Sequence, residues 1–208
     1  MAGNGTAAIS LSAIARVLGV SQPALYRYYA SRDDLVTALI VDAFNDLADT
    51  LAAADQDIPS EDYPRRLLAV LLTYREWALA HPVDFQLIYG NPIPGYQAPY
   101  EVTAPAAGRT FAVILNILGQ AYAAGLLRPA ESHFRAAEAL NLYLPPQEVR
   151  QEAPLPAVIV YIGVMGWYHI HGMITLELFH HVQTMIADTG TFYRHEVEEL
   201  MRSFGLTP

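Results

Sequence analysis

The chain has 208 residues, enough for one domain of ordinary size or two small domains that share a core. With 53% hydrophobic and 16% charged residues and a mean hydropathy of +0.20, its composition excludes an intrinsically disordered protein. The lack of cysteine excludes a disulfide framework, a thiolate metal site and a cysteine nucleophile, and the formal charge of -9 argues against a nucleic-acid partner.

That negative charge is unevenly distributed along the chain. All twelve basic residues are arginines, and three of them, Arg16, Arg27 and Arg32, lie in the first 32 residues. This segment contains no Asp or Glu, so its formal charge is +3. The remaining residues carry nine arginines and twenty-one acids, a balance of -12. The N-terminal segment is therefore still a candidate for DNA binding.

The hydrophobic periodicity predicts an all-α protein, without convincing strand alternation. A first helix is indicated by an apolar stripe at i, i+3, i+4 and i+7, formed by Leu11, Ile14, Ala15 and Leu18. Ser21 is a predicted N-cap for a second, short helix that ends near Tyr29. Ser31 is a predicted N-cap for a third helix that runs to about Leu51, with Asp34 as its capping-box partner.

The rest of the chain follows a polar link from Asp55 to Pro64. Further helices are predicted at about 64–80, 83–89, 107–124, 131–144, 156–180 and 192–204. The proline-rich segment 91–106 is predicted to be a long loop, of the kind that often carries function. Two parts are expected: an N-terminal unit over 1–52 and a larger helical unit over 53–208.

Residues 10–29 match the pattern of a helix-turn-helix. Ala15 is small at the point where two steeply crossing helices approach closely. Gly19 follows four residues later, where the turn favours a left-handed backbone. Leu25 lies six residues further on and would anchor the second helix in the shared core. This spacing favours a DNA-binding motif over an ordinary amphipathic helix pair.

The segment ISLSAIARVLGVSQPALYRYYASRDDLVTALI resembles the DNA-binding unit of the TetR family of transcription regulators. The likeness rests on the LSAIARVLGVS run, the ALYRYY helix and the SRDDL start of the next helix. It implies that the second helix of the motif lies in the major groove of operator DNA. It also implies that the following helix links this unit to a ligand-binding domain.

The chemistry of the second helix agrees with that implication. Its N-terminus presents free N–H groups and a positive dipole end to phosphate. Amide and methyl side chains can read base edges, whereas tyrosine and arginine side chains suit phosphates. The predicted DNA-binding residues are Ser10, Ser21, Gln22, Ala24, Tyr26, Arg27, Tyr29 and Arg32.

The N-terminal unit departs from the family pattern in one respect. The family places a helix of about fifteen residues before the motif, but nine residues precede Ser10, and Gly3, Asn4 and Gly5 cannot form such a helix. We therefore expect the first helix of the unit to be missing. The alternative function is a small-molecule-binding helical dimer whose DNA-binding head is truncated, weak or inactive.

The larger part of the chain resembles, less sharply, the TetR subgroup named for its Trp-His-Gly signature. The residues that carry this likeness are Trp167, His171 and Gly172. Trp167 and His171 are i, i+4 and so share one helical face. His171 is either a structural core histidine or part of a pocket wall that recognises an effector.

Aromatic residues are the candidates for that pocket, since tyrosine combines an apolar ring with a polar tip. We expect a mostly apolar site among the helices that start near Pro64, Ala107 and Pro156, with the 91–106 loop at its mouth. The predicted ligand-binding residues are Trp77, Phe85, Tyr89, Tyr96, Tyr100, Phe111, Tyr122, Trp167, Tyr168 and His171.

The helix predicted near 156–180 has no polar face, so it must be buried on every side or cross a membrane. A core on one side and a second subunit on the other explain it better than a span, because the run contains His169 and His171 and has no flanking charge asymmetry. The family resemblance implies a four-helix bundle between two subunits. A stripe on the last helix is the expected dimer surface: Tyr193, Val197, Leu200 and Phe204.

An enzyme is the competing class, and the sequence argues against it. His169 and His171 point about 200° apart on a helix and cannot share a metal. Glu177 and His181 are i, i+4, but two ligands make a poor metal site. The chain has no HExxH, no GxSxG and no phosphate-binding glycine loop. We expect no catalytic residues, no metal and no cofactor.

The sequence thus predicts a cytoplasmic, homodimeric, ligand-responsive transcriptional regulator, with no membrane partner. Its partners would be double-stranded operator DNA and a small hydrophobic or aromatic effector that releases it, as a repressor, from the operator. Effector binding would favour a separation of the two recognition helices that no longer fits the operator half-sites.

Overall fold

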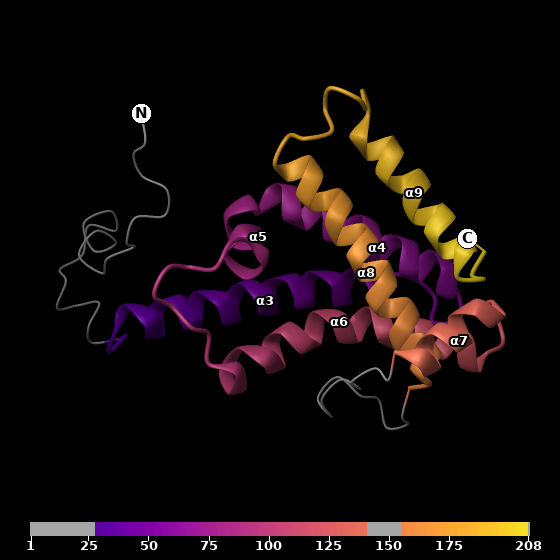
Figure 1. The fold of residues 1–208 in the computed structure, drawn as a ribbon, viewed down its shortest axis with the longest axis horizontal. Coiled ribbons are helices and arrows are strands. Elements are labelled where there is room, and N and C mark those ends of the chain that lie inside the picture. The colour runs from indigo at the N-terminus through magenta and orange to yellow at the C-terminus, as the bar shows by residue number, and fades with distance from the viewer. Residues whose placement is uncertain (1–27, 141–154, 208) are drawn as a thin grey trace.

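The computed structural model describes residues 28–140 and 155–207 (Figure 1). All regular elements in these two ranges are α-helices, and this confirms the predicted fold class. Of the predicted DNA-binding residues, Ser10, Ser21, Gln22, Ala24, Tyr26 and Arg27 lie outside the described residues.

Helix α3 spans Arg32–Gln56 and begins where the sequence predicts. The Ser31 hydroxyl accepts a hydrogen bond of 3.1 Å from the Asp34 N–H and donates one of 2.9 Å to the Asp34 carboxylate. The carboxylate thus binds the capping hydroxyl instead of the Ser31 N–H that a capping box requires. α3 also continues five residues beyond Leu51, so the proposed boundary between residues 52 and 53 falls inside a continuous helix.

Helices α4 and α5 confirm the predicted elements to within one residue at each end. α4 spans Tyr63–Ala80, and its first turn is capped by the Asp62 carboxylate, which accepts from the Arg65 N–H at 3.3 Å. α5 spans Pro82–Tyr89, with its proline at the first position, where the missing N–H has no helical partner to lose.

The predicted 91–106 loop is wrong in its second half, because α6 spans Tyr100–Ala123. Pro99 precedes the helix, and its carbonyl accepts hydrogen bonds from the N–H groups of Val102 and Thr103 and from the Thr103 hydroxyl. Pro105 lies inside the helix and is exposed, so its ring faces away from the packed side. The number of prolines in 91–106 therefore predicted a longer loop than the structure has.

The last three helices follow the predicted order, and their bounds are α7 at Glu131–Ala139, α8 at Ala157–Leu178 and α9 at Thr189–Ser203. The residues predicted to extend α7 to 144 lie outside the described residues. α8 crosses in front of α4 and α6 in Figure 1 and packs against both, as well as against α7 and α9. By length and composition alone, both α6 and α8 are long and apolar enough to cross a membrane.

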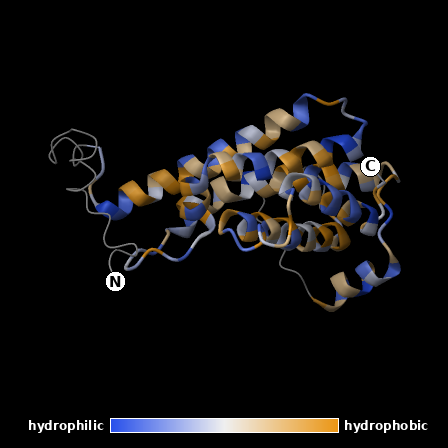
Figure 2. Ribbon diagram, turned by 90° about the horizontal axis from the view of Figure 1, so that it is seen from above, coloured by the Kyte–Doolittle hydropathy of each residue, from blue (hydrophilic) through white to orange (hydrophobic). Residues whose placement is uncertain are grey.

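The main core lies where α3, α4, α6, α8 and α9 meet, and Figure 2 shows hydrophobic positions along these helices. Buried polar groups connect the ends of the helices that surround this core. The Arg66 guanidinium binds the Asp55 carboxylate through two nitrogens, at 2.7 and 3.0 Å, and donates to the carbonyl of Ser60 and the amide oxygen of Gln120. This joins the C-terminus of α3 to α4 and α6.

The apolar stripe of α9 belongs to this same core. Tyr193 and Val197 are fully buried, Phe204 is 7% exposed, and Leu200 is partly buried against the core. The Tyr193 hydroxyl donates to the carbonyl of Leu71 at 2.8 Å. Three of the four residues predicted to form the dimer surface are therefore buried inside their own subunit, and Leu200 is partly buried against the same core. The amphipathic pattern located a buried face, but it could not distinguish the core of one subunit from an interface.

Candidate ligand-binding cavity

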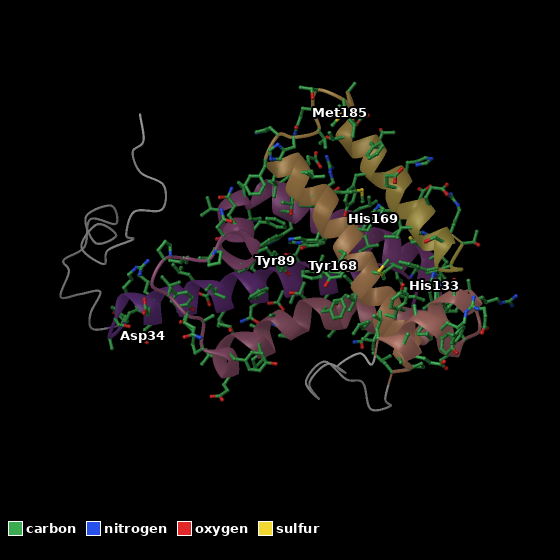
Figure 3. All side chains as sticks on the ribbon, viewed as in Figure 1. Asp34, Tyr89, His133, Tyr168, His169 and Met185 are labelled. Atoms are coloured by element: carbon green, nitrogen blue, oxygen red, sulfur yellow. The ribbon has the colours of Figure 1, made fainter. Side chains whose placement is uncertain are left out.

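A cavity of about 440 Å³ lies among helices α3, α4, α5, α6 and α8. This volume is within the range of small-molecule sites, roughly 300–1,000 Å³. A neighbouring void of about 20 Å³ is too small for anything larger than a water. In Figure 3 the labelled Tyr89 and Tyr168 lie near the middle of the molecule, and both contribute to the larger cavity.

Residues from all five helices form the wall of the cavity. Six of the ten are aromatic, and the others are small or aliphatic. The lining consists of Phe44, Tyr74, Tyr89, Ala107, Thr110, Phe111, Ile114, Val164, Trp167 and Tyr168. Four of the residues predicted for the pocket are therefore on its wall, namely Tyr89, Phe111, Trp167 and Tyr168.

His171 lies directly behind this wall, enclosed by aromatic rings. Its Nδ1 atom is 3.0 Å from the Tyr74 hydroxyl. The imidazole stacks on the Phe85 ring, with centroids 5.2 Å apart and planes at 21°, and meets Tyr89 edge-on at 4.7 Å. Trp167, one turn earlier on α8, is 5.2 Å away. Trp167 and His171, the residues of the Trp-His-Gly signature, thus belong to one aromatic cluster that supports this wall of the cavity.

Burial sets the protonation of these groups. It lowers the pKa of His171, which keeps the imidazole neutral at pH 7. It raises the pKa of the Tyr74 hydroxyl far above its ordinary value and that of Tyr89 to about 12. The Tyr74–His171 pair is therefore uncharged, and its hydroxyl is always protonated in the physiological range.

Five other predicted pocket residues do not line the cavity. Trp77 is a core residue whose indole N–H donates to Asp46 at 2.7 Å, which ties α4 to α3. Phe85 is buried behind the wall, and Tyr122 packs partly against the core. Tyr100 is 68% exposed. The Tyr96 hydroxyl is 2.9 Å from that of Thr37 and anchors the loop to α3.

The remaining wall residues were missed by sequence reasoning. Phe44 belongs to a buried face of α3 that also includes Val36 and Ile40, whereas Leu39 is 43% exposed. Ala107 and Thr110 leave room because they are small. α6 contains many other small residues, among them Ala104, Ala106 and Gly108, so no local pattern singled these two out.

The two predicted DNA-binding residues that the structure describes lie at or just before the N-terminus of α3. Tyr29 precedes the helix and is partly buried, whereas Arg32 occupies its first position. The Arg32 guanidinium is 3.7 Å from the carboxylate of Asp33. α3 thus connects this end of the chain directly to Phe44, on the cavity wall, three turns later.

The histidines and acids of the described ranges form no group of three that could hold a metal ion. Glu177, considered above with His181, is instead paired with Arg75, whose guanidinium donates to both carboxylate oxygens at 2.7 and 2.6 Å. The Thr189 hydroxyl donates to the same carboxylate at 2.6 Å. Burial by itself would raise the pKa of Glu177, but the hydrogen bonds from Arg75 and Thr189 outweigh it and lower that pKa.

Comparison with known families identifies the class of protein to which this chain belongs. Residues 1–39 match the family described as bacterial regulatory proteins of the tetR family. Residues 67–200 match the tetracyclin repressor-like C-terminal domain. The chain therefore belongs to the TetR family and is a DNA-binding transcriptional regulator of the helix-turn-helix type, not an enzyme.

Individual relatives agree with this assignment. The HTH-type transcriptional regulators Rv1816 of Mycobacterium tuberculosis and Mb1846 of Mycobacterium bovis are each 34% identical over 201 residues, which cover 91% of this chain and 81% of theirs. The crystal structure of SCO4313 is also 34% identical, with a TM-score of 0.73 and coverage of 93% of this chain and 85% of that one. A tetR-family regulatory protein from Rhodococcus RHA1, at 19% identity, shares the fold, with a TM-score of 0.59 and coverage of 98% and 90%.

Proposed function

We propose that this regulator is a repressor that leaves its operator when a small hydrophobic or aromatic molecule occupies the cavity. The single observation that carries the proposal is the position of Phe44. Its ring forms part of the wall of a 440 Å³ cavity, and it belongs to the helix that begins immediately after the DNA-binding segment. A ligand in the cavity therefore touches the element that positions the DNA-binding unit.

Contacts between α3 and α6 would transmit a change at the cavity to α3, and so to the DNA-binding unit. The Arg109 guanidinium on α6 donates to the side chains of Asn45 and Asp49 on α3. On the cavity side, the Thr110 hydroxyl faces the Phe44 carbonyl at 3.5 Å. A ligand that favours a different spacing of α3 and α6 shifts the population between two arrangements of the DNA-binding units. The repressor is then released because its recognition helices no longer match the half-sites.

The proposed repressor acts as a homodimer in the bacterial cytoplasm. A helix-turn-helix protein reads two half-sites about 34 Å apart, which requires two copies related by a two-fold axis. With the α9 stripe buried in the core, the partner copy would meet the outer faces of α8 and α9. These faces expose large apolar side chains that a second subunit would cover: Met165, Leu176, Phe179 and Phe192.

The experiment begins with DNA and then adds ligands. Genomic fragments captured by the full chain are sequenced, and the enriched site is labelled for fluorescence anisotropy at two salt concentrations. We expect nanomolar specific binding that weakens with salt as phosphate contacts are lost. Release of this DNA by neutral aromatic compounds supports the proposal. A failure to enrich any site would instead support the alternative, a helical ligand-binding dimer with an inactive DNA-binding head.

A further inference from the structure

The walls of the cavity contain no formal charge. None of the ten lining residues, all within the described part of the chain, is Asp, Glu, Lys or Arg. Two arginines on the cavity helices are paired with carboxylates outside the lining: Arg109 with Asp49, and Arg75 with Glu177. An ion entering this cavity would lose part of its hydration without gaining a counterion from the wall, and such desolvation disfavours binding of the ion.

The shape and chemistry of the wall favour a flat ring. Aromatic side chains project from five different helices, so a planar ligand finds both faces and edges to pack against. Such rings also attract cations through their π-faces. Cation sites of this kind gain most when a carboxylate completes them, and the described lining residues include none. The neutral ligand is therefore the better match.

One hydroxyl on the wall is fixed in position. Tyr74 is 2% exposed, and its oxygen is held 3.0 Å from Nδ1 of His171. A hydroxyl has one donor and two acceptor sites, and the bond to the imidazole uses one of them. Its remaining capacity is directed to the neighbouring Tyr89 and Trp167 side chains, and a ligand hydroxyl or carbonyl would take the place of one of them. Tyr168 differs, because it is 65% exposed and its hydroxyl can bond to water.

We propose that the cavity selects an uncharged aromatic molecule with one hydrogen-bonding group, and that the Tyr74 hydroxyl, oriented by His171, binds that group. This inference rests on the proposed function, since it specifies the ligand of the same cavity. It assigns Phe44, Phe111 and Trp167 to packing against the ring of the ligand. It assigns discrimination against anions and cations to the absence of a counterion among the described wall residues.

Four naphthalenes with the same ring system test the proposal: naphthalene, 2-naphthol, 2-naphthoate and 2-naphthylmethylammonium. Each competes at pH 7.5 with the neutral fluorescent probe N-phenyl-1-naphthylamine for the full chain. We expect both neutral compounds to bind and both ions to bind more than about tenfold more weakly than 2-naphthol. A charged compound that binds as tightly as 2-naphthol would overturn the inference.

The variant Tyr74→Phe tests the assigned hydrogen bond. In the wild type, 2-naphthol should bind about 3- to 10-fold more tightly than naphthalene, the worth of one net hydrogen bond. In Tyr74→Phe this ratio should fall to about one, while naphthalene affinity is kept. Tyr161→Phe, a partly buried tyrosine of α8 outside the cavity lining, is the matched control and should keep the wild-type ratio.

The possible failures are distinguishable from one another. If neither the probe nor any naphthalene binds, the ligand-binding cavity itself fails, and with it the proposed function. If the ligands bind but the ratio of 2-naphthol to naphthalene is the same in Tyr74→Phe as in the wild type, only the assignment of Tyr74 is overturned. Because naphthalene and 2-naphthol are also compared on the wild-type chain, a variant that fails to fold leaves the charge preference and the hydroxyl preference measurable.

Discussion

The Phe44 ring of α3 meets the Tyr89 ring at the end of α5 edge-on, with centroids 5.6 Å apart and planes at 85°. Both rings line the cavity, and Tyr89 also contacts His171 and Trp167. The contact therefore joins the helix that follows the DNA-binding segment to the aromatic group at the signature residues of α8. In the proposed function, a ligand that displaced either ring would change how α3 packs against the other helices of the cavity.

The energy of this contact is measurable with a double-mutant cycle. Phe44→Leu and Tyr89→Leu keep apolar volume but remove one ring each. We expect a coupling free energy of about 0.5–1.5 kcal/mol between them in urea unfolding, as for other edge-to-face pairs. Strictly additive effects of the two substitutions would show that the rings do not stabilise each other.

The ion pair between Arg75 and Glu177 is mostly buried, with side-chain exposures of 17% and 10%. Glu177→Gln leaves the guanidinium without its counterion, and we expect the free energy of unfolding to fall by about 3–5 kcal/mol. Glu199→Gln is the control, because Glu199 is exposed and pairs with Arg202 on the surface; its loss should cost less than about 1 kcal/mol. Equal effects in chemical denaturation would contradict the assigned difference in burial.

The neutral state of His171 predicts a dependence of stability on pH. Since burial lowers the pKa of His171 below its ordinary value of 6.5, the unfolded chain takes up a proton more readily than the folded one. The stabilising contribution is complete above pH 6.5 and is lost as the pH falls below it, with a slope of at most about 1.4 kcal/mol per pH unit. Thermal unfolding between pH 7.5 and 5.5 should show a shallower pH slope for His171→Gln than for the wild type. Identical slopes would mean that His171 does not contribute to the pH dependence.

The cap of α3 lies next to the DNA-binding segment, and it is testable by itself. Ser31→Ala removes the oxygen that accepts from the Asp34 N–H, and the expected loss is about 0.5–2 kcal/mol. Ser31→Asn supplies another capping oxygen and should recover most of that stability. Equilibrium denaturation of the wild type, Ser31→Ala and Ser31→Asn measures these free energies of unfolding. A Ser31→Asn chain as unstable as Ser31→Ala would count against the capping role.

Local rules predicted much of the helical framework. Ser31 and the periodicity that follows it located the start of α3, and the prolines at the N-termini of α4 and α5 located those helices to within one residue. The position of Trp167 and His171 on one face of α8 also predicted part of the cavity wall. These features depend on residues close together in sequence, and a sequence pattern reports such features directly.

Features that depend on distant residues were not predictable in the same way. Pro105 suggested a loop, but packing of α6 against α3 extends the helix through it. The stripe of Tyr193 and Val197 showed that α9 has a buried face without showing what buries it. Phe44 and Ala107 meet at the cavity only because α3 and α6 pack side by side, and no local pattern reports that pairing.

The central claim is that occupancy of the cavity controls DNA binding, and the most direct test fills the cavity by mutation. Ala107→Trp places a large ring on the cavity wall, whereas Ala123→Trp places the same ring at the exposed C-terminal end of α6. Anisotropy of the labelled operator is measured for each chain with and without 2-naphthol. We predict that 2-naphthol weakens DNA binding by the wild type and by Ala123→Trp at least about tenfold but leaves Ala107→Trp unaffected. Release of DNA from Ala107→Trp at the wild-type concentration of 2-naphthol would contradict the claim.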